Sequence, residues 1–301
     1  MKRDFLTLLD LSAKEISALL KRAIDMKSGI DANKCPLIGK SIGLLFEKAS
    51  TRTRVSFEVG IYQLGAHPIY LNPNEIQLGR GETIPDTARA LSRYLDAIVI
   101  RTFGHALLAE FASHSSVPVI NGLSDLHHPC QALGDLMTIL EKKGRLKDIR
   151  IAYVGDGNNV ANSLIEAASV TGMNLTIACP EGHEPDPEVL ERVRAAANSE
   201  ILILREPKEA VGRADVVYTD VWVSMGQEKE SKKRKKRFKD YQINSKILSC
   251  AKKDVVVLHC LPAHRGEEIT DEVMDGPQSA VFDQAENRLH AQKALLELLV
   301  S

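Results

Sequence analysis

The sequence has few cysteines, almost no net charge and no long apolar run, and each of these absences excludes a class of protein. Its five cysteines are an odd number without paired spacing, which favours reduced thiols in a cytosol-like compartment over a disulfide framework. The 39 lysines and arginines nearly balance the 40 aspartates and glutamates, so the net charge of −1 provides no global basic field for nucleic acid or an anionic membrane. No run reaches the roughly 18 apolar residues of a transmembrane helix, and no apolar leader with a small-residue cleavage site opens the chain. We therefore expect a soluble cytoplasmic protein that acts on small molecules or on other proteins.

The order of the predicted elements indicates two α/β domains. The 301 residues are enough for two domains of about 150 residues each. Apolar strand-like runs alternate with segments of helical spacing. The expected strands are residues 41–46, 97–100, 117–120, 149–154, 175–178, 216–218 and 255–258, and the expected helices are residues 12–27, 55–65, 131–142, 160–171 and 285–300. We expect two mainly parallel sheets flanked by helices, one in residues 1–147 and one in residues 148–284, with the C-terminal helix 285–301 packing back on the first domain.

The run Ser50-Thr51-Arg52-Thr53-Arg54 follows an expected strand and precedes an expected helix. Hydroxyls and guanidiniums there join unpaired backbone N–H groups and the positive end of the helix dipole. Arginine donates two parallel hydrogen bonds to phosphate, so a dianionic phosphate suits this segment. The run lacks the Gly-x-x-x-x-Gly-Lys pattern of a P-loop. The alternative is a capped helix with exposed arginines.

Two further polar segments follow expected strands. His127-His128-Pro129-Cys130-Gln131 combines imidazole and amide groups that can donate to a carbonyl oxygen, although a structural histidine is the commoner finding. Gly155-Asp156-Gly157-Asn158-Asn159 is similar to the first half of a dinucleotide fingerprint, but Val160 stands in place of the third glycine, which disfavours an NAD site. Its asparagines are suited to hold a substrate carboxylate.

Three segments in the second half carry chemically active side chains. Asp220 and Ser224 are spaced to clasp a substrate ammonium, and a turn capped by the aspartate explains the pattern equally well. Cys260 lies between two histidines, but one thiol and two imidazoles support a zinc site only weakly, and no activating base for a nucleophilic thiol is evident. Residues 232–237 are all basic, and with a net charge near zero a solvated face is a better interpretation than a nucleic-acid site.

Each of the polar segments lies at the carboxyl end of an expected strand, where open α/β sheets bind ligands. Taken together, they make the chain resemble the aspartate/ornithine carbamoyltransferase family over essentially its whole length. Residues 46–54, Phe-Glu-Lys-Ala-Ser-Thr-Arg-Thr-Arg, match the family's carbamoyl phosphate signature, and residues 128–131, His-Pro-Cys-Gln, match its second shared motif. Asp220, the Ser-Met-Gly of residues 224–226 and the His-Cys-Leu-Pro of residues 259–262 resemble elements of the members that use ornithine.

The resemblance implies an activity and a set of site residues. The expected reaction transfers the carbamoyl group of carbamoyl phosphate to the δ-amine of L-ornithine, giving L-citrulline and phosphate in arginine biosynthesis, with no metal and no cofactor. The residues implied to bind carbamoyl phosphate are Ser50, Thr51, Arg52, Thr53, Gln77, Arg101, His128, Gln131 and Arg288. Those implied to bind ornithine are Asn159, Asp220, Ser224, Met225, Cys260 and Leu261, and the catalytic ones are Arg101, His128, Asp220 and Cys260. Because Gln77 matches a residue that family members insert from a neighbouring subunit, a homotrimer or a multiple of trimers is also implied.

Other functions predict different features. A carbamoyltransferase that uses putrescine or another amine shares the scaffold but typically departs from the Ser-Met-Gly element. A non-catalytic relative is expected to have lost the phosphate arginines or the His-Pro-Cys-Gln motif, and this chain retains both. A nucleic-acid-binding protein needs aromatic residues interleaved with its basic run, and none are present between residues 232 and 237.

Overall fold

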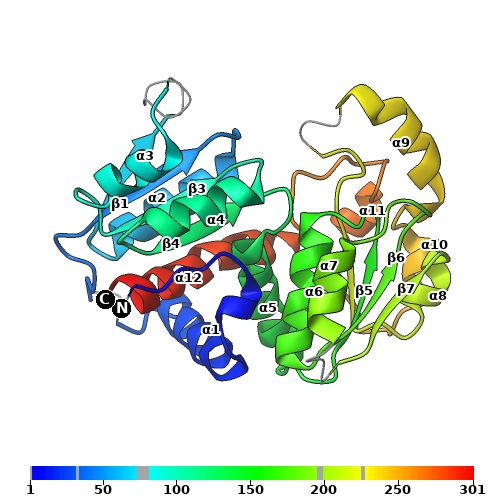
Figure 1. Ribbon diagram of the computed structural model, residues 1–301. Coiled ribbons are helices and arrows are strands. Elements are labelled where there is room, and N and C mark those ends of the chain that lie inside the picture. The colour runs from blue at the N-terminus through cyan, green and yellow to red at the C-terminus, as the bar shows by residue number, and fades with distance from the viewer. Residues whose placement is uncertain (1, 32–33, 73–80, 195–198, 225–227) are drawn as a thin grey trace. The chain divides into compact units, whose positions relative to one another are not determined.

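The computed structural model describes residues 2–31, 34–72, 81–194, 199–224 and 228–301, which form two compact units (Figure 1). The first unit comprises Met1–Met137 and Glu286–Ser301, and the second comprises Thr138–Ala285. Each unit is built around a parallel sheet flanked by helices, and the last helix returns to the first unit, so the predicted fold class is confirmed. No helix in these ranges has the length and apolar character required to cross a membrane.

The sheet of the first unit has four parallel strands in the order β2-β1-β3-β4. The strands are β1 (Ser41–Phe46), β2 (His67–Leu71), β3 (Ala97–Arg101) and β4 (Val119–Leu123). The central strand β3 is buried along its length, whereas the edge strand β2 is only partly buried and contains Pro68. Proline and partial exposure are typical of edge strands, and they weaken the apolar signal by which a strand is recognised in sequence.

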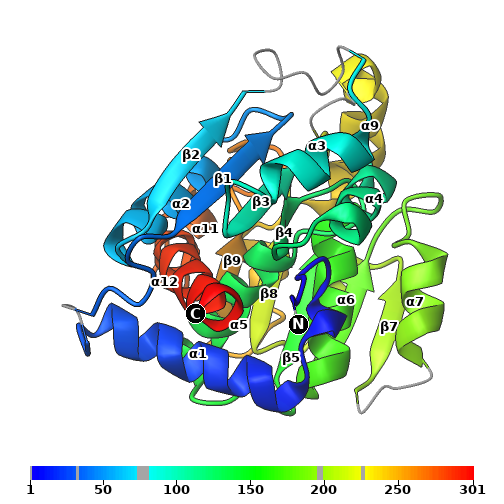
Figure 2. The same cartoon turned by 60° about the vertical axis from the view of Figure 1, so that its left-hand side comes forward.

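Helices cover both faces of this sheet. They are α1 (Ala13–Lys27), α2 (Thr51–Gln63), α3 (Ile84–Leu91), α4 (His105–His114), the start of α5 (Pro129–Lys143) and most of α12 (Val281–Val300). Figure 2 shows α3 and α4 on one face, with α2 and α12 on the other. Beneath α3 and α4 lies an apolar core that includes Ile98, Ile100 and Phe111. The alternation of strand and helix places the functional loops together at the carboxyl ends of the strands.

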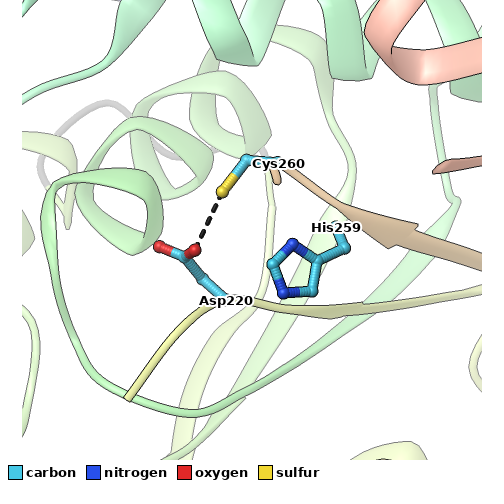
Figure 3. Close-up of side chains that lie close together, drawn as sticks. All are labelled: Asp220, His259 and Cys260. Atoms are coloured by element: carbon cyan, nitrogen blue, oxygen red, sulfur yellow. Dashed lines mark hydrogen bonds between the residues drawn. The ribbon is translucent and has the colours of Figure 1, made fainter. Parts of the chain in front are cut away.

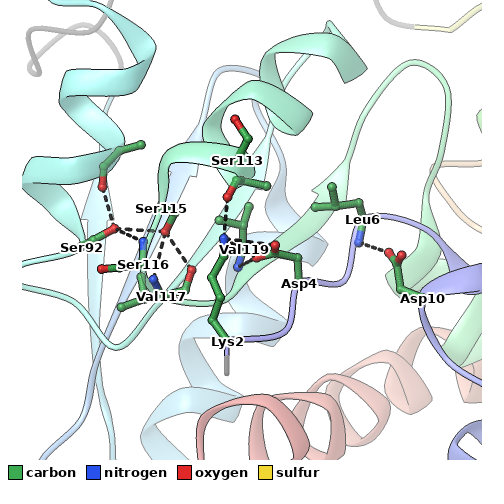
Figure 4. A network of polar contacts seen from close by, with 12 residues as sticks. Lys2, Asp4, Leu6, Asp10, Ser92, Ser113, Ser115, Ser116, Val117 and Val119 are labelled. Atoms are coloured by element: carbon green, nitrogen blue, oxygen red, sulfur yellow. Dashed lines mark hydrogen bonds and ion pairs between the residues drawn. The ribbon is translucent and has the colours of Figure 1, made fainter.

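The N-terminal segment protects the β4 edge of the first sheet (Figure 4). Phe5 pairs with Ile120 in a short parallel bridge, and its N–H donates to the carbonyl of Val119 at 2.9 Å. The carboxylate of Asp4 accepts from the N–H of Val119, also at 2.9 Å. These contacts satisfy backbone groups that an edge strand would otherwise expose.

The second unit contains a five-stranded parallel sheet in the order β7-β6-β5-β8-β9. The strands are β5 (Arg150–Val154), β6 (Asn174–Ala178), β7 (Ile201–Leu204), β8 (Val216–Thr219) and β9 (Val256–His259). The helices are α6 (Asn159–Thr171), α7 (Pro187–Arg194), α8 (Pro207–Val211), α9 (Ser231–Phe238), α10 (Ser245–Leu248) and α11 (Asp271–Met274). Helices α6 and α7 lie on one face and α8 and α10 on the other (Figure 1). The chain therefore reverses its direction of winding between β5 and β8, as it does between β1 and β3, and such switch points are where open sheets bind ligands.

One predicted helix starts earlier than expected. The helix expected from Val55 begins at Thr51, because Ser50 caps it: the Ser50 hydroxyl accepts from the N–H of Thr53 at 3.2 Å. The sequence predicts a polar turn before the helix, but residues 51–54 form the first turn of the helix itself.

Candidate active site

One candidate site lies within the first unit, at the N-terminus of α2, which follows a short loop after β1. Ser50 is the N-cap, and Thr51, Arg52 and Thr53 supply the first turn. This turn combines N–H groups that lack a partner within the helix with the positive end of the helix dipole. Arg54, the last residue of the run, is directed elsewhere: its Nε donates to Glu58 at 2.8 Å and its guanidinium stacks on the ring of Tyr70.

Two buried arginines converge on the hydroxyl of Thr53. Arg288, on α12, donates through Nη2 to Thr53 Oγ1 at 2.6 Å, and Arg101, at the end of β3, donates through Nη1 to the same atom at 3.5 Å. The two arginines are only 3% and 8% exposed. Buried like charges raise each other's electrostatic energy, so an anion bound beside this cluster would be stabilised by both guanidiniums.

His128 and Gln131 lie beside this cluster at the beginning of α5. His128 is 5% exposed and Gln131 is 1% exposed. Burial lowers the pKa of His128 well below its usual 6.5, and the charges of Arg288, Arg101 and Arg52 lower it further. The imidazole is therefore neutral at physiological pH, and it can donate a hydrogen bond to a carbonyl oxygen without carrying a charge.

His128 is expected to make the folded chain less stable in acid. Because its pKa is lower in the folded than in the unfolded state, the unfolded chain binds the extra proton once the pH falls below about 6.5. The free energy of unfolding should decrease with falling pH in this window, and His128→Gln should remove that part of the decrease. Urea unfolding of both proteins at about pH 7.5 and about pH 5.5 measures the effect. An identical pH dependence in the two proteins would contradict it.

The cysteine in the His-Pro-Cys-Gln motif is part of the packed interior of the first unit. Cys130 is fully buried and donates to the carbonyl of Asn121 at 3.3 Å. Burial raises the pKa of its thiol to about 12, so it is not a nucleophile at neutral pH.

Of the residues implied to bind carbamoyl phosphate, those in described ranges gather in the first unit, and Gln77 lies outside those ranges.

A second candidate site, within the second unit, surrounds Asp220, which directly follows β8 (Figure 3). Its carboxylate accepts from Asn158 Nδ2 at 2.7 Å, from the N–H of Val221 at 2.8 Å and from the Cys260 thiol at 2.9 Å. Asp220 is 6% exposed, whereas Cys260 is half-buried. A buried carboxylate held by three donors is a rigid acceptor for a cationic or amine group.

Asn158, one of the asparagines that the sequence suggests for a substrate carboxylate, has a structural role instead. Its Oδ1 caps α6 by accepting from the N–H groups of Val160 and Ala161, while its amide nitrogen binds Asp220. Tyr153 donates to the same Oδ1 at 3.3 Å. Asn158 is thus fully engaged with the protein, and Asn159, the first residue of α6, is half-buried beside it.

The glycines after β5 have structural functions. A Cβ at Gly157 would lie 2.2 Å from the backbone nitrogen of Pro185, so only glycine lets that loop pass. Close packing of this loop therefore accounts for the second glycine of the partial dinucleotide fingerprint, and no nucleotide site is needed to explain it.

His259 orients the loop that carries Cys260 and Leu261. His259 and Glu268 are both buried, and Nε2 of the imidazole lies 3.0 Å from a Glu268 oxygen. The N–H of Leu261 donates to His259 Nδ1 at 2.9 Å, and Leu261 has a φ of 60°, a strained value for leucine. Glu268 was not predicted, because nothing in its local pattern distinguishes it from a surface residue.

Ligand atoms of Asp220, His259 and Cys260 lie within 4.8 Å of one another, close enough for a metal ion. The geometry alone does not favour a metal ion, because both imidazole nitrogens of His259 and the thiol of Cys260 already have hydrogen-bond partners within the protein.

The remaining predicted residues are Ser224, which is half-buried, and Met225, which lies outside the described ranges.

The basic run of residues 232–237 lies on α9, and it is not wholly a solvated face. Its lysines and Arg237 are exposed, but Arg234 is 6% exposed and pairs with Asp156 at 2.5 Å. Arg234 also donates through Nε to the carbonyl of Trp222 at 2.6 Å. The buried arginine therefore anchors α9 to the loop that carries Asn158.

Comparison with protein families identifies the lineage of this chain. Residues 3–141 match the description "Aspartate/ornithine carbamoyltransferase, carbamoyl-P binding domain", and residues 147–299 match "Aspartate/ornithine carbamoyltransferase, Asp/Orn binding domain". The chain belongs to the aspartate/ornithine carbamoyltransferase family. The resemblance inferred from the sequence is thereby confirmed.

Individual members of the family are similar over the full length. The ornithine carbamoyltransferase of Syntrophus aciditrophicus is 55% identical over 302 residues, which cover 100% of both chains. The solved ornithine carbamoyltransferase from Pyrococcus furiosus has a TM-score of 0.95 and 51% identity, covering 99% of this chain and 97% of that one. The one from Gloeobacter violaceus has a TM-score of 0.90 and 49% identity, covering 100% and 99%.

Proposed function

We propose that this family member transfers the carbamoyl group of carbamoyl phosphate to the δ-amine of L-ornithine, forming L-citrulline and phosphate. The observation that carries the proposal is the arginine cluster, in which Arg101 and Arg288 converge on Thr53 while Arg52 acts on His128. Full-length relatives named ornithine carbamoyltransferase support ornithine as the acceptor.

The first unit is suited to bind and activate carbamoyl phosphate. Ser50, Thr51, Arg52 and Thr53 would hold the phosphate at the N-terminus of α2, where its two negative charges meet guanidiniums and the helix dipole. Arg101 and the neutral His128 would donate to the carbonyl oxygen, on which negative charge develops in the tetrahedral transition state. A well-placed donor of this kind is worth about 3–4 kcal/mol.

The second unit is suited to bind the acceptor. Asn159, Asp220, Ser224 and Met225 would hold the amino-acid end of ornithine, with the Asp220 carboxylate accepting from nitrogen. Cys260 and Leu261 would border the reacting δ-amine. A free δ-amine has a pKa near ~10 and is therefore mostly protonated at neutral pH. Attack on the carbonyl carbon requires the neutral amine. The amine nitrogen then bonds to the carbonyl carbon, the C–O bond to phosphate breaks, and the departing phosphate takes up the proton that the amine nitrogen loses. The arginines neutralise the charge of the leaving phosphate.

We further propose how the chain is organised. Residues 1–147 with 285–301 would form the carbamoyl phosphate domain, and 148–284 the ornithine domain. A homotrimer, with Gln77 completing a neighbour's site, is supported by Val55, Val59 and Tyr62, which expose a continuous apolar stripe on α2. A cytoplasmic location and a place in arginine biosynthesis fit this reaction.

The decisive experiment measures citrulline formation from carbamoyl phosphate, with ornithine and putrescine compared as acceptors. We expect kcat/KM for ornithine to exceed that for putrescine by about 10³-fold or more, since putrescine lacks the groups that Asn159 and Ser224 would bind. A preference for putrescine would overturn the acceptor assignment while leaving the carbamoyl phosphate site. Absence of turnover with either amine would overturn the proposed reaction.

A further inference from the structure

A buried carboxylate on α5 contacts the amide of Gln131. Asp135 is one helical turn after Gln131, and both side chains are 1% exposed. Gln131 Nε2 donates to Asp135 Oδ1 at 2.9 Å. Gly134, next to Asp135, packs against Arg288 so closely that a Cβ there would lie 2.9 Å from Arg288 Cγ. The pair therefore lies beside the arginine cluster.

The other end of the Gln131 amide is buried without a hydrogen-bond partner in the described part of the chain. A buried amide oxygen in that condition costs free energy unless a ligand supplies a donor. A carboxylate accepts hydrogen bonds and cannot donate them, so Asp135 can contact only the NH₂ end of the amide. Asp135 thereby fixes Gln131 with its oxygen available as an acceptor and prevents the flipped orientation.

We propose that Asp135 is a positioning residue that makes the site select acyl phosphates bearing an N–H donor, and so distinguishes carbamoyl phosphate from acetyl phosphate. This inference rests on the proposed function and adds the basis of its selectivity for the acyl group. The NH₂ of a carbamoyl group donates to Gln131 Oε1, whereas the methyl of an acetyl group leaves that oxygen buried and unpaired. Sites that bind a substrate N–H in this way reject analogues that lack it.

Asp135→Asn tests the proposal with little change in volume. The asparagine amide can donate to Gln131 Oε1, which allows the Gln131 amide to turn and present its NH₂ to the ligand. Two donors then face each other, so the KM for carbamoyl phosphate should rise about 30-fold. The inhibition constants of acetyl phosphate and inorganic phosphate should change less than about threefold, because the phosphate-binding residues are untouched. The ratio of the acetyl phosphate inhibition constant to the carbamoyl phosphate KM is the readout, and a general loss of stability would not alter it.

A second variant tests the hydrogen-bond polarity directly. In the double variant Gln131→Glu with Asp135→Asn, the asparagine donates to the glutamate, and the second glutamate oxygen again accepts from the carbamoyl NH₂. We expect it to recover about tenfold of the lost selectivity ratio. Asp215→Asn is the matched control, because Asp215 is also a buried aspartate but pairs with Lys252 in the second unit. It should lower the melting temperature without changing the ratio.

The outcomes separate this inference from the proposed function. If the wild-type chain forms no citrulline, the proposed function fails. If it forms citrulline and Asp135→Asn changes both constants equally, or neither, the role of Asp135 is wrong while the function stands. A selective rise in the carbamoyl phosphate KM that the double variant partly reverses supports the inference.

Discussion

Replacing Arg52 by alanine is expected to lower kcat/KM for carbamoyl phosphate by about 10³-fold, because it would remove a charged donor from the proposed phosphate site. Arg52 lies in the first turn of α2, and its charge acts on the buried His128 together with those of Arg101 and Arg288. Initial rates of citrulline formation, with carbamoyl phosphate varied at saturating ornithine, measure the loss. Inorganic phosphate should also lose most of its ability to raise the melting temperature, since its stabilising effect depends on its affinity for the folded state.

Arg54 offers a matched control two residues further along the same helix. Its guanidinium pairs with Glu58 and stacks on Tyr70. Arg54→Ala should therefore change kcat/KM by less than about threefold, as expected for an exposed ion pair. Equal losses in the two variants would mean that general electrostatics, and not the position of Arg52, governs the site.

Replacing Asp220 by asparagine is expected to lower kcat/KM for ornithine by about 10³-fold, because a buried, charged acceptor loses its charge while its partners remain. The carboxylate holds Asn158 Nδ2 and the Cys260 thiol at 2.7 and 2.9 Å, and an amide cannot accept from both with the same strength. Rates measured with ornithine varied at saturating carbamoyl phosphate test this. The inhibition constant of inorganic phosphate should stay within about twofold, since the phosphate site belongs to the other unit.

Asp254→Asn is the matched control for this second variant. Asp254 is in the same unit, but its carboxylate is 74% exposed and pairs with Lys143. No effect on ornithine kinetics is expected. A loss in kcat/KM for ornithine no larger than this control would exclude Asp220 from the acceptor site.

The parts of the structure that were predictable from sequence are those set by local pattern. Buried strands such as β1 and β3 are largely apolar runs, Ser50 lies in the short loop after β1, and Asp220 directly follows β8. Within each parallel sheet the carboxyl ends of the strands share one edge, so chain order alone brings the polar residues of that sheet together.

The missed features depend on position within the sheet or on distant partners. Strands β2 and β7 were not predicted, because edge strands are short and only partly buried. The pairing of Arg234 with Asp156 joins residues far apart in the chain, and no local pattern encodes it. Asp135 is four residues after Gln131, a spacing that brings helical side chains together, but the sequence alone does not show that both residues are buried.

The return of α12 to the first unit has a consequence for synthesis on the ribosome. Arg288 contacts Thr53 across 235 residues of sequence. The strands of the first sheet are all made by residue 123, so the nascent chain can begin to assemble that sheet early. Its arginine cluster nevertheless stays incomplete until translation has passed residue 288. Chains cut short before α12 therefore lack one of the two buried arginines that contact Thr53, and only molecules translated almost to the end acquire the full cluster.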